Sequence, residues 1–218
     1  MDLGLAGLVF FVTGASGGIG AEIVSALRGE GALVAAHSRR GVAEDGGTLS
    51  VLGDVRDPGA TARAMEQASA RFGRVDACVA NAGIWPADAL ELDAMPEARV
   101  REVVETNLLG AMWTARAFFA ALKAHGPRAD GRGASVTFIG STAGRFGEPG
   151  HAEYAATKAA LVGLTRSWKN EIVKVDPRAR VNLVEPGWTA TEMAAEALAA
   201  SGAIARVTKT MPLQQIAT

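Results

Sequence analysis

A glycine-rich turn between an apolar strand and a helix limits what this chain can fold into more than any other feature. Leu8–Val12 is continuously apolar, as in a strand that is buried on both faces of a parallel sheet. The turn Thr13-Gly-Ala-Ser-Gly-Gly-Ile-Gly20 follows, and apolar residues then recur at helical spacing from Ile19 to Leu27. Backbone N–H groups of such a turn and the N-terminus of its helix can hold a pyrophosphate. A plain tight turn is the alternative, but the strand before it and the helix after it favour a dinucleotide site.

Short apolar strands alternate with helical patterns along the rest of the chain. Glycines end the first helix, and the further strands that we expect are 32–37, 48–53, 77–81, 135–139 and 181–185. The expected helices are Pro58–Phe72, about Glu97–Lys123 and about Ala152–Val175, with a loop at Gly41–Gly47. This alternation predicts an α/β fold, with a single Rossmann-like, doubly wound parallel sheet and helices on both faces. Because crossovers between parallel strands are right-handed, we expect the strand order 3-2-1-4-5-6, with ligand beyond the carboxyl ends of the strands.

The composition narrows the class of protein further. A chain of 218 residues is long enough for one domain with a continuous core, and we expect residues 1–218 to form a single domain. The net charge of −1 does not indicate a broad basic patch for nucleic acid. The longest early apolar run, Leu8–Val12, is too short to cross a bilayer and lacks the flanks of a secretion signal. We therefore expect a cytoplasmic protein without a membrane partner.

The cysteine and the histidines do not indicate a metal site. Cys78 is the single cysteine and lies in an apolar run, which favours a buried structural thiol and excludes a disulfide framework. His37, His125 and His151 are scattered without ligand spacing, so no metal is expected. His151 is close enough to Tyr154 in the sequence to touch a substrate, but placement at the surface is favoured.

The end of the second strand indicates which dinucleotide binds. An acidic residue in this place usually holds the ribose 2′-hydroxyl of NAD, but here Ser38 is followed by Arg39 and Arg40. The guanidinium fork suits a 2′-phosphate, so NADP(H) is favoured and NAD(H) remains possible. Two solvated arginines on a surface loop are the alternative.

Three residues in the second half of the chain fit acid/base chemistry. Tyr154 and Lys158 are four residues apart on a helical segment, so their side chains share one face. The ordinary pKa of a phenol is about 10, and a nearby ammonium stabilises the phenolate, so we expect Lys158 to lower the pKa of Tyr154. Ser141 ends a strand at the binding edge, where its hydroxyl can stabilise a substrate oxygen that gains negative charge. Each residue alone also fits a purely structural role.

Five motifs in one order resemble the short-chain dehydrogenase/reductase family. They are Thr13-Gly-x-x-x-Gly18-x-Gly20, Asn81-Ala82-Gly83, Asn107, Ser141 and Tyr154-x-x-x-Lys158, and the match extends to Pro186-Gly187. The resemblance implies a catalytic set of Asn107, Ser141, Tyr154 and Lys158. It further implies that Lys158 holds the nicotinamide ribose, and that Asn107 kinks its helix and anchors a water that relays protons.

The resemblance also implies how the rest of the cofactor is held. Asp54 would bond the adenine amino group, although a plain strand-ending aspartate is the alternative. Asn81-Ala82-Gly83 would pass under the adenosine ribose, and the segment from Pro186 to Thr191 would meet the carboxamide. The residues expected to contact the cofactor are Gly14, Ser16, Gly18, Ile19, Gly20, Ser38, Arg39, Asp54, Val55, Asn81, Ala82, Gly83, Tyr154, Lys158, Pro186, Gly187, Thr189 and Thr191.

The resemblance ends in the last part of the chain. We expect a lid segment at about 188–210 with a helix at Glu192–Ala205, and Met211-Pro212-Leu213 resembles the approach to a further helix. That helix and a seventh strand are missing from the sequence, which leaves a sheet edge open and puts tetramer assembly in doubt. A homodimer or homotetramer is still expected.

These features together favour an oxidoreductase. It would transfer a hydride between NADP(H) and a small, largely apolar carbonyl compound or secondary alcohol, with Trp85, Trp188 and Met193 lining the pocket. A non-catalytic dinucleotide-binding sensor or scaffold is the main alternative. An epimerase or dehydratase that uses the cofactor only transiently is a third.

Overall fold

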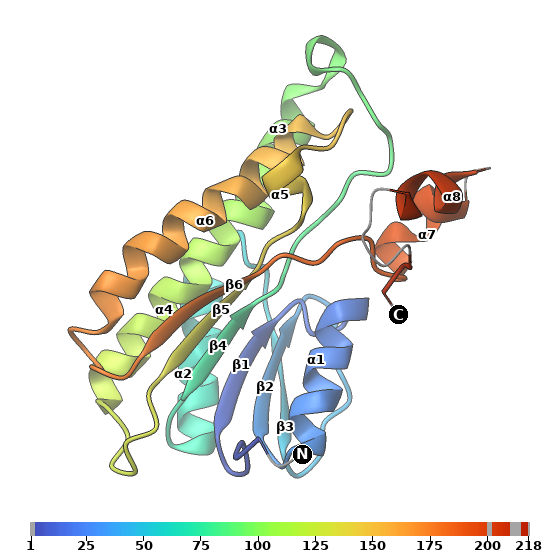
Figure 1. Ribbon diagram of the computed structural model, residues 1–218. Helices are drawn as coiled ribbons and strands as arrows, with labels where there is room; N and C mark the ends of the chain where they lie inside the picture. The colour runs from blue at the N-terminus through green and yellow to red at the C-terminus, as the bar shows by residue number, and fades with distance from the viewer. Residues whose placement is uncertain (1–2, 200–201, 210–214, 218) are drawn as a thin grey trace.

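The computed structural model describes residues 3–199, 202–209 and 215–217 and shows a parallel sheet with helices on both faces (Figure 1). Its strands run in the order β3-β2-β1-β4-β5-β6, and all neighbours are parallel. Their bounds are β1 (Val9–Thr13), β2 (Leu33–Ser38), β3 (Thr48–Leu52), β4 (Ala77–Ala80), β5 (Ser135–Ile139) and β6 (Arg180–Val184). The predicted fold class and strand order are confirmed. Over the ranges that the structure describes, no seventh strand joins the sheet.

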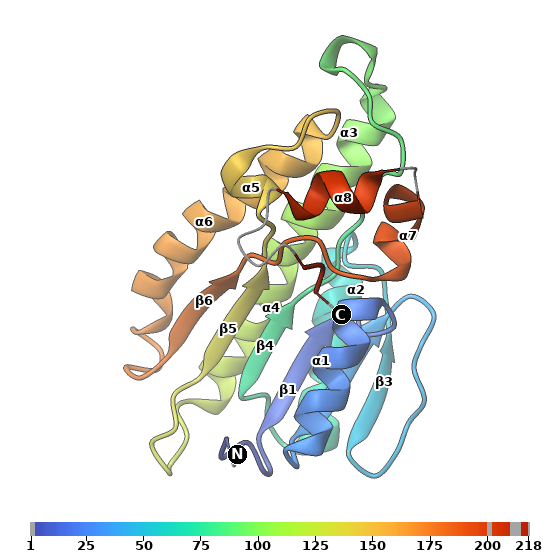
Figure 2. The ribbon, with the colours of Figure 1, turned by 45° about the vertical axis from the view of Figure 1, so that its right-hand side comes forward.

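The helices lie on the two faces of this sheet in unequal number. Their bounds are α1 (Gly18–Gly29), α2 (Pro58–Phe72), α3 (Glu97–Val103), α4 (Gly110–His125), α5 (Ala143–Phe146), α6 (Ala152–Ile172), α7 (Glu192–Ala199) and α8 (Ala203–Thr208). Helices α2, α4 and α6 cover one face, and α1 lies on the other (Figures 1 and 2). Helices α7 and α8, red in both views, lie beyond the carboxyl end of the sheet.

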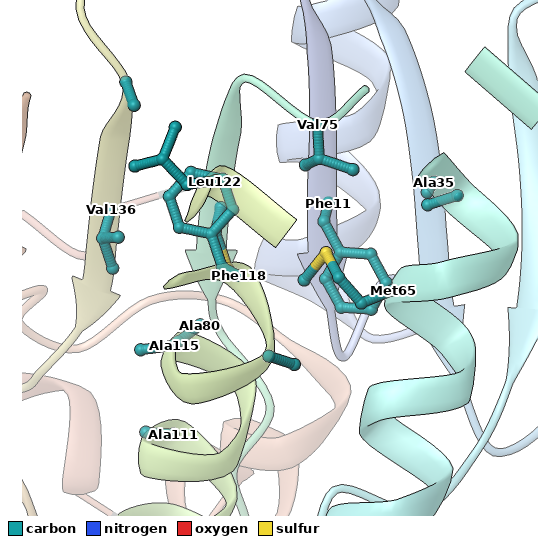
Figure 3. Packing of buried hydrophobic residues seen from close by; sticks show 14 of the residues in the cluster. Phe11, Ala35, Met65, Val75, Ala80, Ala111, Ala115, Phe118, Leu122 and Val136 are labelled. Atoms are coloured by element: carbon teal, nitrogen blue, oxygen red, sulfur yellow. The ribbon is translucent and has the colours of Figure 1, made fainter. Parts of the chain in front are cut away.

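The alternation of side chains along the strands creates two cores. Phe11 and Ala35 point to the face of α2, α4 and α6, whereas Val12 and Val34 point to the face of α1. The larger core contains Met65 of α2 and Phe118 and Leu122 of α4, which Figure 3 shows with Phe11 between the sheet and the two helices. Cys78 is buried in β4, as predicted. Close packing on both faces fixes the strands, and therefore the edge where their carboxyl ends meet.

The long helix expected at Glu97–Lys123 is divided into three parts. Helices α3 and α4 are separated by a π-helical segment, Val104–Leu109, which contains the buried Asn107. A π-turn inserts an extra residue into a helix and is frequent at functional sites. Here it turns the Asn107 side chain toward the loop after β4, as described below.

The expected lid helix Glu192–Ala205 is wrong, because two helices, α7 and α8, occupy this part of the chain. Gly202, which precedes α8, has a φ of 71°, a left-handed conformation that a continuous helix does not allow. The described residues 215–217 return to the segment after β6: Ala190 N–H donates to Ala217 O at 2.8 Å, and Ala217 N–H to Trp188 O at 3.2 Å. Met211-Pro212-Leu213 lies outside the described residues. None of the described helices has the length and hydrophobicity to cross a membrane.

Candidate active site

A cavity of about 790 Å³ opens at the carboxyl ends of the strands. This volume lies within the usual range of ligand sites, which is roughly 300–1,000 Å³. Every residue predicted to bind cofactor or act in catalysis lines the cavity, except Asn107. The elements that place them are the turn after β1 and the ends of β2, β3, β4, β5 and β6, together with the N-terminal part of α6.

Three glycines of the first turn, Gly14, Gly18 and Gly20, leave no space for a side chain. Gly14 has a φ of 67°, and a Cβ there would lie 2.9 Å from Ala82 Cα. A Cβ at Gly20 would collide with the Gly14 carbonyl oxygen, and one at Gly18 would lie 2.8 Å from Thr191 Cγ2. The first N–H groups of α1 have no acceptor within the helix and face this turn. The cavity therefore offers a cradle of backbone donors that fits a diphosphate.

The loop after β4 is bound directly to this turn. The Thr13 hydroxyl accepts hydrogen bonds from the N–H groups of Asn81 and Ala82, both at 3.1 Å. The Asn81 side-chain amide donates to the carbonyls of Thr13 at 3.0 Å and Gly14 at 3.2 Å. These bonds join two motifs that lie far apart in the sequence and stiffen the cradle.

The end of β2 is open and carries positive charge. The Ser38 hydroxyl accepts a hydrogen bond from Gly41 N–H at 2.9 Å, which stabilises the turn after β2. Arg39 and Arg40 are exposed, line the cavity and form no ion pair within the described ranges. The Asp54 carboxylate is bound by the Arg56 guanidinium at 2.6 Å. The hydrogen bonds from Arg56 lower the pKa of Asp54.

His37 also lies at this end of the cavity, and no sequence pattern predicted that it would. His37 is buried and lines the cavity, and neither ring nitrogen has a hydrogen-bond partner among the described residues. Burial lowers the pKa of His37 to about 4, so the ring is neutral at neutral pH. Its burial follows from the β1–β2 pairing and its contact with Phe11, which the sequence does not display.

Tyr154, Lys158 and Ser141 meet at the opposite end of the cavity from the glycine turn, here called the catalytic end. Helix α6 presents Tyr154 and Lys158 one turn apart, and Lys158 Nζ lies 5.6 Å from the centre of the tyrosine ring. The buried ammonium donates to Ile139 O of β5 at 2.8 Å. Ser141, just beyond β5, accepts a hydrogen bond from Ala143 N–H at 3.1 Å, and its side chain lies near enough to Tyr154 to lower the pKa of the phenol.

The surroundings of Tyr154 act on its pKa in opposite directions. Burial raises the pKa of Tyr154, the interaction with the Ser141 side chain opposes this, and the negative charge of Glu148 adds to the rise. The Lys158 ammonium donates to Ile139 O, and burial lowers its own pKa to about 8, so the expected lowering of the Tyr154 pKa by Lys158 stays a prediction. In this structure the phenol is therefore the stable form at neutral pH.

Asn107 lies beneath the cavity rather than in its wall. Its side-chain oxygen accepts from Ile84 N–H at 2.8 Å, and its amide donates to Ile84 O at 2.9 Å. A Cβ at Gly83 would lie 3.2 Å from this oxygen and 3.5 Å from Lys158 Nζ, so all three residues are packed together. Since Ile84 occupies the Asn107 side chain, the proton relay expected of this residue stays a prediction.

Aromatic side chains surround the mouth next to Tyr154. Trp85, Trp188 and Met193 line it, as predicted. The Trp85 ring meets Tyr154 edge-on at 4.7 Å and Trp188 at 5.9 Å between ring centres. The predicted surface placement of His151 is wrong: it is 5 % exposed, because Trp85 stacks on it at 3.8 Å.

Glu148 is a residue of this mouth that the sequence analysis missed. It lies in the loop between α5 and α6, lines the cavity and forms no salt bridge in the part of the chain that is described. Burial raises the pKa of its carboxyl group. The sequence indicates only that Glu148 is one of the charged residues between Ser141 and Tyr154.

The fold, the glycine cradle and the Ser–Tyr–Lys group define a dinucleotide-dependent type of oxidoreductase site. The chain matches the family model of the short chain dehydrogenases over residues 8–202, and it belongs to this family.

Similar proteins carry several names. 3-Oxoacyl-(acyl-carrier-protein) reductase FabG of Escherichia coli (strain K12) is 34% identical over 196 residues, which cover 86% of this chain and 75% of FabG. A short-chain dehydrogenase from Brucella melitensis, described as a glucose/ribitol dehydrogenase, has a TM-score of 0.86 at 25% identity, covering 100% of this chain and 86% of that one. The NADH-dependent reductase A1-R′, solved with NAD, has a TM-score of 0.76 at 27% identity, covering 87% of this chain and 82% of that one.

Proposed function

We propose that this protein is an NADP(H)-dependent oxidoreductase that transfers a hydride between the nicotinamide and a carbonyl compound or secondary alcohol. The observation that carries the proposal is one continuous cavity with two functional ends. The glycine cradle and two exposed arginines lie at one end, and Ser141, Tyr154 and Lys158 lie at the other. A binding module without catalysis has no use for a buried, hydrogen-bonded phenol and ammonium at the second end, so a sensor or scaffold is not favoured.

The residues of the cavity fit a nicotinamide dinucleotide. Glycines occupy the positions where a Cβ would fill the cradle, and A1-R′, a reductase of similar structure, was solved with NAD. The preference for the 2′-phosphate rests on Arg39 and Arg40, because β2 ends in a serine instead of a carboxylate. Lys158 and Thr191 are the residues expected nearest the nicotinamide half. When bound, the cofactor supplies or accepts the hydride.

The side chains of the catalytic end transfer the proton and stabilise the developing charge. In the reductive direction, the Tyr154 hydroxyl donates a proton to the substrate oxygen as the carbonyl carbon is reduced. The Ser141 hydroxyl donates a hydrogen bond to the same oxygen and stabilises its developing charge. The raised pKa of Tyr154 keeps its proton in place at neutral pH, which suits an acid. Lys158 holds the ribose, and its ammonium lies behind the phenol ring.

The mouth of the cavity limits the substrate. Trp85, Trp188 and Met193 make it largely apolar, which favours an apolar carbonyl compound. The similarity to FabG makes a 3-oxoacyl thioester the first compound to test. We also expect a cytoplasmic homodimer or homotetramer, paired through the long helices α4 and α6, which light scattering of the purified protein will test.

The experiment that tests the proposal is a titration with NADPH and with NADH, read by fluorescence, followed by turnover of a carbonyl panel. We expect tighter binding of NADPH and its oxidation in the presence of a 3-oxoacyl thioester or a simple ketone. Binding without turnover of any carbonyl would contradict the enzymatic role. Absence of binding by both cofactors would contradict the dinucleotide site.

A further inference from the structure

Arg99 of α3 lies outside the cavity lining and joins three segments that form its wall. Its side chain is 12% exposed, and its Nε donates to the Glu153 carboxylate at 2.7 Å. Its two other nitrogens donate to Asp88 O at 2.6 Å and Gly150 O at 3.2 Å. A single guanidinium therefore connects the loop after β4, the loop before α6 and the first turn of α6.

A fourth contact of Arg99 is with His151. An arginine nitrogen lies 3.3 Å from His151 Nδ1, and because arginine can only donate, this contact is a hydrogen bond in the tautomer that carries its proton on Nε2. Burial and the positive charge of Arg99 lower the pKa of His151, and Glu153, which faces it from α6, opposes them. The neutral ring offers a flat face on which Trp85 stacks.

The partner of Arg99 lies directly beside the proposed acid. Glu153 precedes Tyr154 in α6, its side chain is 1% exposed, and its second oxygen has no partner among the described residues. A buried carboxylate with one cation is strongly held in place, since loss of that cation leaves an unpaired buried charge. The pair thus fixes the first turn of α6, which carries Tyr154.

The two loops are fitted to one another around this pair. Leu90 N–H donates to Gly150 O at 3.0 Å, and a Cβ at Gly150 would lie 2.6 Å from the side chain of Ala89. The first of these loops carries Trp85, which meets Tyr154 edge-on. Movement of the loops would therefore move Trp85 relative to Tyr154.

We propose that Arg99 is a positioning residue of the reaction, which holds Trp85 and His151 against Tyr154 and so fixes where the phenol meets the substrate oxygen. This inference rests on the proposed function. Arg99 acts through the wall and touches neither substrate nor cofactor. Its planar fork supplies several donors in fixed directions, which a lysine ammonium cannot reproduce. A small displacement of reacting groups is enough to lower a rate by about 10²-fold.

The test compares four variants of the full chain in reduction of the carbonyl compound that the wild type turns over best. Arg99→Met removes the guanidinium, and Arg99→Met with Glu153→Leu also removes the buried charge left behind. Arg99→Lys keeps a charge but not the fork. Arg101→Met is the matched control, because Arg101 lies on the same helix with a 69% exposed side chain and, among the residues that the structure describes, forms an ion pair only with Glu97 of that helix.

We expect kcat of Arg99→Met to fall by roughly 10- to 100-fold while the Kd of NADPH stays within about twofold. The double variant should regain the melting temperature of the wild type without regaining kcat. Arg99→Lys should regain only part of the wild-type kcat. Arg101→Met should match the wild type. Full recovery of kcat in the double variant or in Arg99→Lys would overturn the inference, and so would an unchanged kcat in Arg99→Met.

A second readout does not depend on activity. Acrylamide quenching of tryptophan fluorescence, with Trp85→Phe in each background to isolate Trp85, should show greater access to Trp85 in both Arg99→Met proteins. Unchanged access would contradict the role of Arg99 in the wall. If the wild type turned over no carbonyl compound while the access to Trp85 still depended on Arg99, the proposed function would be refuted. The role of Arg99 in holding the wall would be retained.

Discussion

The two ends of the cavity differ in what holds their functional groups in place. At the phosphate end the contacts are made by backbone, which the Thr13 and Asn81 side chains brace, and by arginines that project into solvent. At the catalytic end, Tyr154, Lys158 and Ser141 are held by partners from the loop after β4, from β5 and from α5.

This difference predicts how each end responds to change. A backbone cradle is sensitive to shape and insensitive to most side-chain changes elsewhere, because its donors belong to the main chain. Exposed arginines contribute modestly, since water and salt screen them. A buried catalytic group loses its function when a single atom is removed. We therefore expect the largest effects of substitution at the catalytic end.

Tyr154→Phe removes one oxygen at the catalytic end. We expect turnover to fall by about 10²–10⁴-fold, the usual contribution of general acid/base catalysis. The Kd of NADPH should change by no more than a few-fold, because the cradle is untouched. Steady-state kinetics and a fluorescence titration measure both quantities, and the melting temperature checks the fold. A turnover equal to that of the wild type would remove Tyr154 from the mechanism.

Gly20→Ala tests the shape of the phosphate end. The added methyl group collides with Gly14 O, a backbone atom that cannot turn away, and lies 2.7 Å from Asn81 Nδ2. We expect the free energy of unfolding to fall by about 1–3 kcal/mol, as in overpacked cores, with a clear loss of NADPH affinity. Chemical denaturation and titration measure these effects.

Gly163→Ala is the control for this substitution. Gly163 is an exposed glycine within α6, and a Cβ there meets nothing within 4 Å. Alanine should stabilise the helix by up to about 1 kcal/mol and leave NADPH binding unchanged. Equal behaviour of the two variants would show that the turn at Gly20 is not a tight cradle.

Arg39→Asp tests the charge at the phosphate end. We expect the ratio of the NADH and NADPH dissociation constants to shift toward NADH by on the order of tenfold, since hydrogen bonds to charged groups contribute about 1.5–3 kcal/mol and this one is exposed. The shift should shrink at high salt. Arg166→Asp, an equal change of charge on α6 away from the cavity, should leave the ratio unmoved. An unaltered ratio in Arg39→Asp would assign the phosphate contact elsewhere.

Glu148→Gln should have the smallest effect and refines the description of the catalytic end. The Glu148 carboxylate raises the pKa of Tyr154, so its removal should lower that pKa. In the reductive direction Tyr154 must be protonated, so the alkaline limb of the kcat profile should move to lower pH. The variant should also improve kcat/KM for a keto acid relative to the matched neutral ketone, because a negative charge leaves the mouth. Glu171→Gln, at the far end of α6, serves as the control, and an identical alkaline limb in the two variants would exclude the coupling.

Much of the fold and of the candidate site could be predicted from the sequence. Periodicity gave the strands to within one or two residues, and the order of strands follows from the handedness of the crossovers. The motifs lie at strand ends, so their meeting at one edge follows from the parallel sheet. The wrong boundaries occur where a local pattern was overridden: the π-segment around Asn107 and the break at Gly202 between α7 and α8.

The sequence by itself determined the fold class, the cradle and the identity of the acid/base candidates, because these depend on short-range patterns that neighbouring residues share. Only the tertiary structure decided that His151 is buried, that Arg99 joins three segments and that Glu148 faces Tyr154. It also decided that burial raises the pKa of Tyr154. The burial of a side chain and the charge around it depend on residues that are distant in the sequence, such as Trp85 and Arg99 around α6. A local sequence pattern does not include those residues.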